Sequence, residues 1–269
     1  MAALIKNNEI RIFPGSADLF QFAANDFKQR AISAVKQKGI FSVVLAGGNT
    51  PKLFFDVLTE AADYKKNIPW RLIQFFFGDE RYFPSDNIKS NYHMAYEHLF
   101  SKVPINPDNI YRIPTEFSDP KDAAKDYEQT LRKVFHIQDN AFPQFDLLYL
   151  GLGDNAHTAS LMPFSDAVKH YAENSLSYTN NQLVTSLFDT ESNMYRITLT
   201  PIAINNGLNI IFIVTGANKA TAVWEVLEGQ IDPLHYPAQL IHCVDRKTIW
   251  YLDQAASARL SMTGIQHGK

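Results

Sequence analysis

Residues 145–163 read FDLLYLGLGDNAHTASLMP. The run from 147 to 150 is continuously apolar, which is typical of a strand covered on both faces of a parallel sheet. Gly151 and Gly153 free the backbone where this strand ends, and open α/β sheets bind ligands outside the carboxyl ends of their strands. We expect a helix to follow the stretch. His157 therefore lies where a pocket is expected, and a histidine can transfer protons near neutral pH.

The rest of the chain alternates strands, short turns and helices. Strand patterns cover 41–46, 71–77, 145–150, 195–199, 208–214 and 248–252, and helix patterns cover 16–38, 90–100, 120–135 and 216–227, with further helices after 51 and 200. This rhythm predicts an α/β protein with an open, mostly parallel sheet flanked by helices. No linker or repeat divides the chain, so we expect a single domain over 1–269, with a cap or insertion over 102–144 as the alternative.

Composition narrows the function classes. The chain has 269 residues, 46% of them hydrophobic and 20% charged, and a net charge of −3. This balance argues against a nucleic-acid partner, which needs clustered Lys and Arg. No apolar run approaches the ~20 residues of a membrane-spanning helix, and the N-terminus lacks a signal-peptide pattern. We therefore expect a cytoplasmic protein without a membrane partner. Its one cysteine, Cys243, excludes an intrachain disulfide and is predicted to be a packed strand residue.

A glycine pair ends the second strand pattern. Residues 47–50 read GGNT, and Pro51 suits the first turn of a helix. Glycines let a backbone approach a ligand closely, and the amides at a helix start bind anions. Gly47, Gly48, Asn49 and Thr50 are therefore candidates for an anion site. The alternative is a bare turn between strand and helix.

Charged residues follow two other strand patterns. Residues 78–81 read GDER, so Asp79, Glu80 and Arg81 follow an apolar strand. Arg81 can clamp a phosphate through its planar guanidinium, and one carboxylate can orient it or act as a base. The alternative is a solvated charge cluster.

Residues 216–219 read GANK, and Lys219 is predicted in the first turn of a helix. A lysine there is unfavourable for the helix dipole unless an anion lies between the lysine and the helix start. An exposed lysine is the alternative.

The sequence offers no metal or nucleotide site. His93 and His98 lie five positions apart on a predicted helix, which is the wrong spacing for a shared metal. The G-x-G-x-x-A match at 151–156 lacks the strand ending in an acidic residue that dinucleotide binding requires about 20 positions later. We therefore expect neither a metal nor an organic cofactor.

Eight segments share their order with one enzyme family. They are LAGGNTP at 45–51, DER at 79–81, SNY at 90–92, GDNAHTASLMP at 153–163, RITLT at 196–200, TGANKA at 215–220, YPAQL at 236–240 and WYLD at 250–253. Between about residues 10 and 256, the chain resembles the 6-phosphogluconolactonase family. The glucosamine-6-phosphate deaminases and ribose-5-phosphate isomerases are related to that family in fold. The resemblance implies their three-layer, Rossmann-like architecture.

The resemblance also implies an activity and a set of roles. The activity is hydrolysis of 6-phospho-D-glucono-1,5-lactone to 6-phosphogluconate, in the pentose phosphate pathway. His157 would act as the general base, with Asp79 and Asn155 ordering the site. Substrate-binding residues would be Gly47, Gly48, Asn49, Thr50, Arg81, Arg196 and Lys219, with Arg81 and Lys219 on the phosphate. Either Arg196 or the amides at 47–49 would stabilise the oxyanion. The partner is a small phosphosugar lactone, and the protein is expected to be a monomer or small homo-oligomer.

Two residues depart from the family pattern. The family usually has Asp where this chain has Asn155, and Gly where it has Ala156. An amide can orient His157 but adds no negative charge beside it. Two other functions therefore remain open. One is a phosphosugar deaminase or isomerase, with Asp79 moving a proton between carbon atoms. The other is a phosphosugar sensor that binds without turnover.

Overall fold

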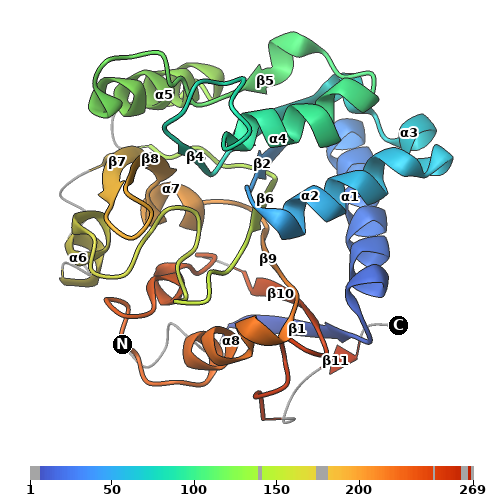
Figure 1. Cartoon of the computed structure of the whole chain (residues 1–269). Helices are drawn as coiled ribbons and strands as arrows, with labels where there is room; N and C mark the ends of the chain where they lie inside the picture. Colours follow the sequence, from blue (N-terminus) through green and yellow to red (C-terminus); the bar gives the residue numbers. More distant parts are fainter. Residues whose placement is uncertain (1–6, 139–140, 174–180, 245, 262–265, 268–269) are drawn as a thin grey trace.

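A parallel sheet forms the centre of the molecule (Figure 1). The computed structural model describes residues 7–138, 141–173, 181–244, 246–261 and 266–267. Within these residues the sheet has eight strands in the order β11-β1-β10-β9-β6-β2-β3-β5, with parallel pairing throughout. Their bounds are β1 Asn8–Phe13, β2 Phe41–Leu45, β3 Ile73–Phe77, β5 Ile110–Tyr111, β6 Leu147–Leu150, β9 Ile210–Val214, β10 Thr248–Asp253 and β11 Gln266–His267. The predicted α/β class is confirmed.

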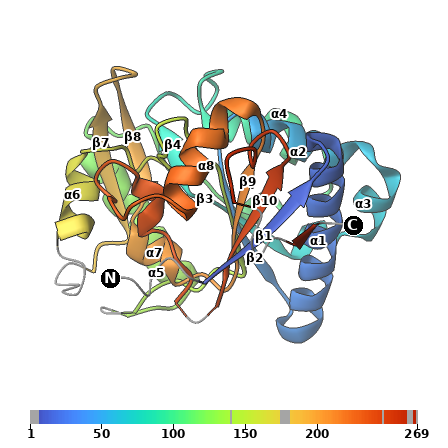
Figure 2. The same cartoon turned by 90° about the horizontal axis from the view of Figure 1, so that it is seen from below.

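The central strands are apolar because both of their faces are covered. All residues of β2, β6 and β9 are buried, as expected for a parallel sheet between helical layers. Figure 2 shows α1, α2 and α3 on one side of this sheet and α5, α6 and α7 on the other. The helices are α1 Ser16–Lys38, α2 Asn49–Glu60, α3 Ala62–Asn67, α4 Asn91–His98, α5 Pro120–Val134, α6 Asp166–Glu173, α7 Pro201–Asn205 and α8 Ala220–Leu227.

Local signals set several helix ends where the sequence predicts them. Gly39 ends α1 with a φ of 83°, a left-handed conformation that glycine adopts without strain. The side chains of Ser90, Asp119 and Thr200 each accept a backbone N–H in the first turn of α4, α5 and α7. These are N-cap contacts, which satisfy amide groups that have no partner inside the helix.

A smaller antiparallel sheet lies beside the main one. It consists of β4 Asp79–Arg81, β8 Met194–Leu199 and β7 Val184–Asp189, in the order β4-β8-β7. A glycine turn followed by a helix is expected from the sequence at GDER, but here strand β4 directly continues the chain after β3. Pairing with β8 places Asp79 opposite Thr198 and Arg81 opposite Arg196. Strand pairing in the small sheet thus fixes the backbone positions of Asp79, Arg81 and Arg196.

The fold confirms one further sequence expectation and corrects others. The helix expected after the stretch 145–163 is present as α6, which begins at Asp166, and residues 151–165 before it form an irregular loop. Cys243 is buried as expected but lies outside any strand, where its Sγ contacts the Gly207 carbonyl oxygen at 3.2 Å. The sequence patterns also missed the strands β1, β4, β5, β7 and β11.

Residues 102–138 and 141–144 pack into the body of the molecule. β5 extends the main sheet beside β3, and α5 packs against β7 and β8. The buried hydroxyl of Tyr127 on α5 lies 2.9 Å from Phe77 N and 3.0 Å from Phe77 O. This part of the chain thus packs against both sheets, and the single domain over 1–269 stays a prediction.

Chain order reverses between β2 and β6, which are neighbours in the sheet. From β2 the chain continues to β3 on one side, whereas from β6 it continues to β9 and β10 on the other. Such a reversal opens a crevice at the carboxyl ends of the two strands. The GGNT turn and the loop that carries His157 both emerge there.

Candidate active site

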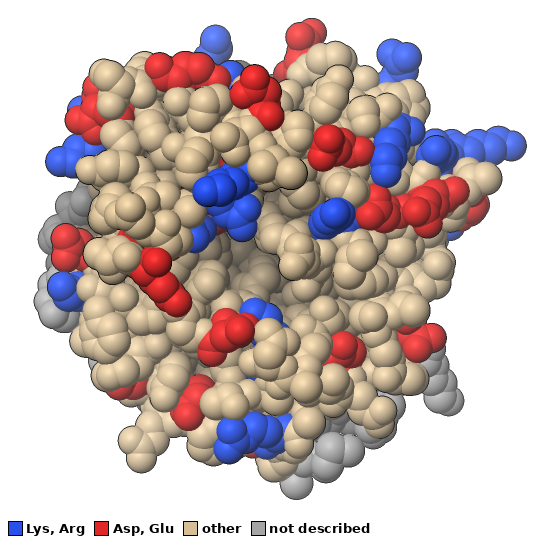
Figure 3. All heavy atoms as spheres, viewed as in Figure 1, with Lys and Arg blue, Asp and Glu red and all other residues tan. Residues whose placement is uncertain are grey.

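A cavity of about 190 Å³ lies at this reversal point. Its lining residues come mainly from the loops after β2, β6 and β9, from β4, which follows β3, and from β8. The strands β9, β6, β2 and β3 are neighbours in the main sheet. Among its lining residues are Gly47, Gly48, Asn49, Thr50, Asp79, Arg81, His157, Arg196 and Lys219. The structure thus brings together every sequence-predicted site residue except Asn155, which lies beside His157. Figure 3 shows a hollow in this face of the molecule with basic side chains at its rim.

His157 is held by Asn155. The Oδ1 atom of Asn155 lies 2.6 Å from His157 Nδ1 and also accepts the His157 backbone N–H at 3.2 Å. The second contact identifies the Asn155 atom as an oxygen, so Nδ1 must carry the proton. Nε2 then carries the lone pair. An imidazole in this tautomer can accept a proton from water through Nε2.

The surroundings keep His157 neutral. Burial lowers the pKa of His157 below its ordinary value of 6.5, and the Arg196 and Lys219 charges lower it further. The Asp79 and Asp189 carboxylates act in the opposite direction but do not reverse the shift. At neutral pH the ring is therefore in the basic form, as a general base requires.

The loop before His157 is tightly built. The Gly153 N–H donates to the His157 carbonyl at 2.8 Å, and the Ala156 N–H donates to the Gly153 carbonyl at 3.0 Å. A Cβ added to Gly153 would overlap the His157 ring. Gly153 therefore has no side chain because the imidazole occupies that space.

Ala156 is strained, and glycine is expected to fit there better. Its φ is 60°, in the left-handed region that costs a non-glycine residue roughly 1–2 kcal/mol. Ala156→Gly removes that strain but raises the backbone entropy of the unfolded chain by up to about 1 kcal/mol. The expected result is no loss in the free energy of unfolding, measured by urea denaturation. Ala34→Gly, within α1, is the matched control and should lose about 1 kcal/mol. Equal losses in the two variants would contradict the strain argument.

Asp79 is buried in the cavity wall at 6% exposure. Its Oδ2 accepts a hydrogen bond from Ser160 Oγ at 2.6 Å, and Asn91 Nδ2 donates to its backbone carbonyl at 3.0 Å. Ser160 follows His157 on the same loop, so Asp79 ties that loop to the small sheet. The predicted ordering role of Asp79 thus has a contact that supports it.

Glu80 faces away from the cavity and anchors the start of α4. Its carboxylate accepts hydrogen bonds from the backbone N–H groups of Arg81, Asn91 and Tyr92 and from Ser90 Oγ, at 2.7–3.0 Å. Burial nevertheless raises the pKa of Glu80 to about 7. These contacts connect the DER and SNY segments, because the carboxylate of Glu80 in the first segment holds the backbone of Asn91 and Tyr92 in the second.

Two arginines face each other across the small sheet. Arg81 and Arg196 are register partners, and like charges in that arrangement repel unless an anion lies between or near them. Arg196 is neutralised by Asp189, with Nε to Oδ2 at 2.9 Å. Arg81 donates to the Lys89 carbonyl at 3.0 Å and has no carboxylate partner among the described residues. Arg81 is thus the better placed of the two to take an anionic ligand.

Lys219 comes from the opposite side of the cavity. It lies in the 3-10 turn Ala217–Lys219 before α8, not inside the α-helix. Its ammonium group pairs with Asp154, which also accepts a hydrogen bond from Asn218 Nδ2 at 3.0 Å. The hydrogen bond from Lys219 is the main reason that the pKa of Asp154 lies below its ordinary value. An incoming anion must compete with Asp154 for Lys219.

The GGNT turn completes the anion-binding side. Asn49 and Thr50 begin the twelve-residue helix α2, and Gly48 before it has a φ of 102°. Thr50 Oγ1 lies 3.3 Å from Thr215 Oγ1, which joins this turn to the loop after β9. Gly48, Asn49 and Thr50 line the same cavity as Arg81 and Lys219, so a phosphate bound there would lie near the start of α2, where helix amides stabilise anions.

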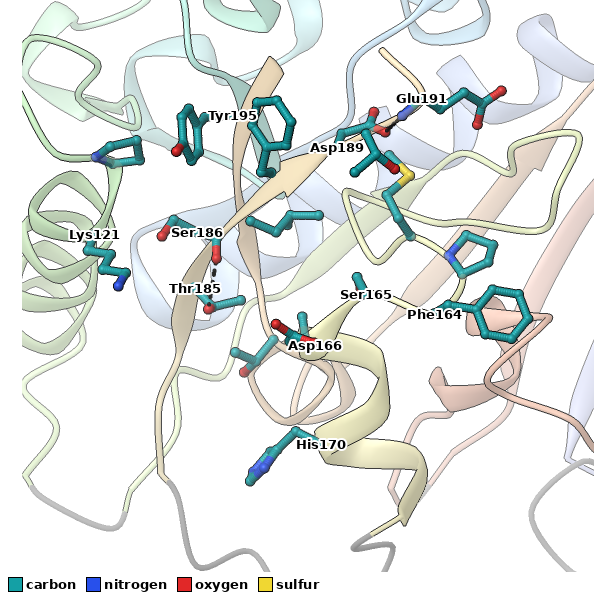
Figure 4. Close-up of a pocket in the computed structure, with 18 of the residues that line it drawn as sticks. Lys121, Phe164, Ser165, Asp166, His170, Thr185, Ser186, Asp189, Glu191 and Tyr195 are labelled. Carbon is teal, nitrogen blue, oxygen red and sulfur yellow. Dashed lines mark hydrogen bonds between the residues drawn. The ribbon is translucent and has the colours of Figure 1, made fainter. Parts of the chain in front are cut away.

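A larger groove of about 1080 Å³ adjoins the site (Figure 4). Its walls include Lys121 at the start of α5, Asp166 and His170 of α6, and Tyr195 of β8. Asn155 and Asp189 also line it. Asn155 holds His157 and Asp189 holds Arg196, so two residues that position side chains of the smaller cavity also line this groove.

Sequence reasoning left out several residues that shape the site. Ser160, Asn91, Asp154 and Asp189 each hold one of the predicted residues in place. Ser160 and Asp154 lie within the segment 153–163, but only the folded chain shows which residue each one contacts. No cluster of three or more His, Cys, Asp or Glu side chains with the arrangement of a metal site occurs in the described ranges. Within the same ranges, no helix has the length and apolar character to span a membrane.

Comparisons with known proteins point to one family. A family model described as glucosamine-6-phosphate isomerases/6-phosphogluconolactonase matches residues 14–250. The chain is 36% identical to a 6-phosphogluconolactonase of Synechocystis sp., over 86% of this chain and 89% of the relative. It is 34% identical to a 6-phosphogluconolactonase of Nostoc sp., over 94% and 98%.

Solved structures agree with the sequence relatives. The 6-phosphogluconolactonase of Trypanosoma brucei superimposes with a TM-score of 0.80 at 26% identity, covering 94% of this chain and 99% of that one. The family model spans most of the chain, and it includes all the loops that line the cavity. On this basis, the chain belongs to the glucosamine-6-phosphate isomerase/6-phosphogluconolactonase family.

Proposed function

We propose that this protein hydrolyses 6-phospho-D-glucono-1,5-lactone to 6-phosphogluconate, a step of the pentose phosphate pathway. The single observation that carries the mechanism is the pairing of His157 with Asn155, which leaves Nε2 as the basic atom in a cavity that also holds basic residues. Hydrolysis of a lactone is helped by a base that accepts a proton from the attacking water, and binding of the phosphate is helped by cationic groups. Family membership and the names of the relatives support the choice of substrate.

Each step of the proposed hydrolysis uses a specific group of the cavity. His157 Nε2 takes a proton as water attacks the lactone carbonyl, and the developing oxyanion is stabilised by Arg196 or by the amides at 47–49. When the carbon–oxygen bond of the ring breaks, the protonated His157 returns its proton to the leaving ring oxygen. Arg81, Lys219 and the amides at the start of α2 hold the phosphate. Asp79 and Asn155 keep the loop and the imidazole in position.

The experiment that tests this function is a measurement of lactone hydrolysis. Freshly generated 6-phosphogluconolactone is given to the native protein, and the spontaneous rate is subtracted. Turnover above that rate supports the proposal. Ammonia release from glucosamine 6-phosphate would favour the deaminase alternative, and binding of 6-phosphogluconate without any turnover would favour the sensor. Oligomeric state and cellular location stay predictions from the sequence.

Asn155→Asp is expected to move the acid limb of the kcat/KM profile to higher pH. The native pKa of His157 is lowered, so activity should persist below pH 6.5 and be lost only when Nε2 is protonated. A carboxylate at position 155 would favour the imidazolium and raise that pKa by about one unit or more. The measurement is the pH dependence of kcat/KM for both proteins. An unchanged limb would show that His157 does not control the profile.

A further inference from the structure

The side chain of Asn91 has an unpaired oxygen at the cavity wall. Asn91 is the first residue of α4 and is 2% exposed. Its Nδ2 donates to the Asp79 carbonyl at 3.0 Å and lies 3.4 Å from Asp79 Oδ1. Both neighbours are acceptors, so the amide orientation is fixed and Oδ1 points away from Asp79. Within the described part of the chain, this buried Oδ1 has no hydrogen-bond partner.

Two neighbours hold Asn91 in this position. Glu80 accepts its backbone N–H at 2.7 Å, which fixes the main chain. On the other side the amide packs against Gly47, where an added Cβ would overlap the Asn91 amide. Gly47 thus leaves room for Asn91, in the turn where Gly47, Gly48, Asn49 and Thr50 line the same cavity.

Leaving a buried acceptor without a donor costs about 1–3 kcal/mol. A fold can retain such a group when a ligand supplies the missing donor. Asn91 lies between Asp79 and the GGNT turn, and both line the cavity with it. The adjacent glycines give the turn freedom to shift slightly and admit a donor to Oδ1.

We propose that Asn91 Oδ1 accepts a hydrogen bond from a hydroxyl group of the sugar, and that Asn91 is therefore a specificity-determining residue. The inference rests on the proposed function for the identity of the sugar. An amide oxygen next to the Asp79 carboxylate attracts a donor and repels phosphate or carboxylate oxygens. The phosphate therefore lies toward Arg81 and Lys219, while a hydroxyl-bearing part of the ring faces Asp79 and Asn91.

The test compares 6-phosphogluconolactone with its 2-, 3- and 4-deoxy analogues. For one of the deoxy lactones, the native protein should have a kcat/KM about tenfold to a hundredfold lower than for 6-phosphogluconolactone, because that analogue leaves the Asn91 oxygen unpaired. In Asn91→Ala, kcat/KM for the full substrate should fall while that for this analogue changes little. The ratio between them should therefore approach one. A ratio equal to the native one would overturn the proposal.

Two further variants separate recognition from general disturbance. Gly47→Ala displaces the Asn91 amide from a different segment and should lower the same ratio, so the test does not depend on one variant folding. Ser160→Ala removes a donor to Asp79 without touching Asn91, and should reduce kcat for all the lactones alike while keeping the ratio. Loss of discrimination in Ser160→Ala as large as in Asn91→Ala would count against a direct contact.

Binding distinguishes the two proposals from each other. Calorimetry with 6-phosphogluconate and its deoxy analogues reports hydroxyl recognition without any turnover. If the native protein hydrolyses no lactone but Asn91→Ala loses discrimination between these acids, the proposed function fails and the Asn91 contact stands. If lactone is hydrolysed and the ratios in Asn91→Ala stay at native values, the Asn91 contact alone fails.

Discussion

His157→Ala is expected to lower kcat for lactone hydrolysis by about 10²–10⁴-fold, the usual contribution of a general base. Among the described residues that line the cavity, His157 is the one neutral base, since its pKa is lowered by burial, and the variant removes it. Phosphate binding should persist because Arg81 and Lys219 stay in place. Stopped assays of lactone hydrolysis measure the first effect, and calorimetry with 6-phosphogluconate measures the second.

A histidine outside the cavity provides the control. The side chain of His235 is 56% exposed and pairs with Asp232. His235→Ala should therefore keep kcat within about twofold of native, as expected of a surface change. If His157→Ala also retained native kcat while binding 6-phosphogluconate normally, another group would have to be the base.

Gly153→Ala is expected to have the second largest effect, about 10²-fold on kcat. The added methyl overlaps the His157 ring, and a small misplacement of a catalytic group can cost a factor of that size. The backbone at Gly153 has no positive φ, so the effect should come from the side-chain overlap alone. The measurement is kcat beside the free energy of unfolding.

The neighbouring glycine and a double variant sharpen this prediction. A Cβ at Gly151 meets nothing within 4 Å, so Gly151→Ala should lose far less activity. If Gly153→Ala acts through His157, the double variant Gly153→Ala/His157→Ala should be no slower than His157→Ala. Additive losses would show that the methyl acts on something other than the imidazole.

The asparagine at position 155 changes how His157 is held. Asn155 orients His157 and fixes its tautomer but carries no charge, so the proposed base is weaker than one paired with a carboxylate would be. Ala156 adds strain in the same loop, with a φ of 60°. The two departures from the family pattern thus lie at adjacent positions, and their physical consequences differ. Asn155 affects the proton affinity of His157, and Ala156 affects backbone strain.

Much of the fold was predictable because its signals are local. The period of α1, the cap at Ser90 and the apolar run of β6 each act over a few residues, and the structure confirms them. The irregular course of 151–165 could not be predicted, because this loop is held by contacts with distant segments, such as Ser160 with Asp79. The strand β4 was missed because its pairing with β8 joins residues more than a hundred positions apart.

The sequence by itself determined the α/β class, the candidate residues and the family, since periodicity, glycine turns and ordered motifs are properties of the chain. Only the tertiary structure decided which of these residues meet. The reversal of strand order between β2 and β6 gathers residues that follow β2, β3, β6 and β9 into one cavity. The pairing of Lys219 with Asp154, the anchoring of α4 by Glu80 and the unpaired oxygen of Asn91 all depend on that gathering. Hydrogen bonds and burial depend on which residues lie close together in the folded chain, and a local sequence pattern does not specify which distant residues these are.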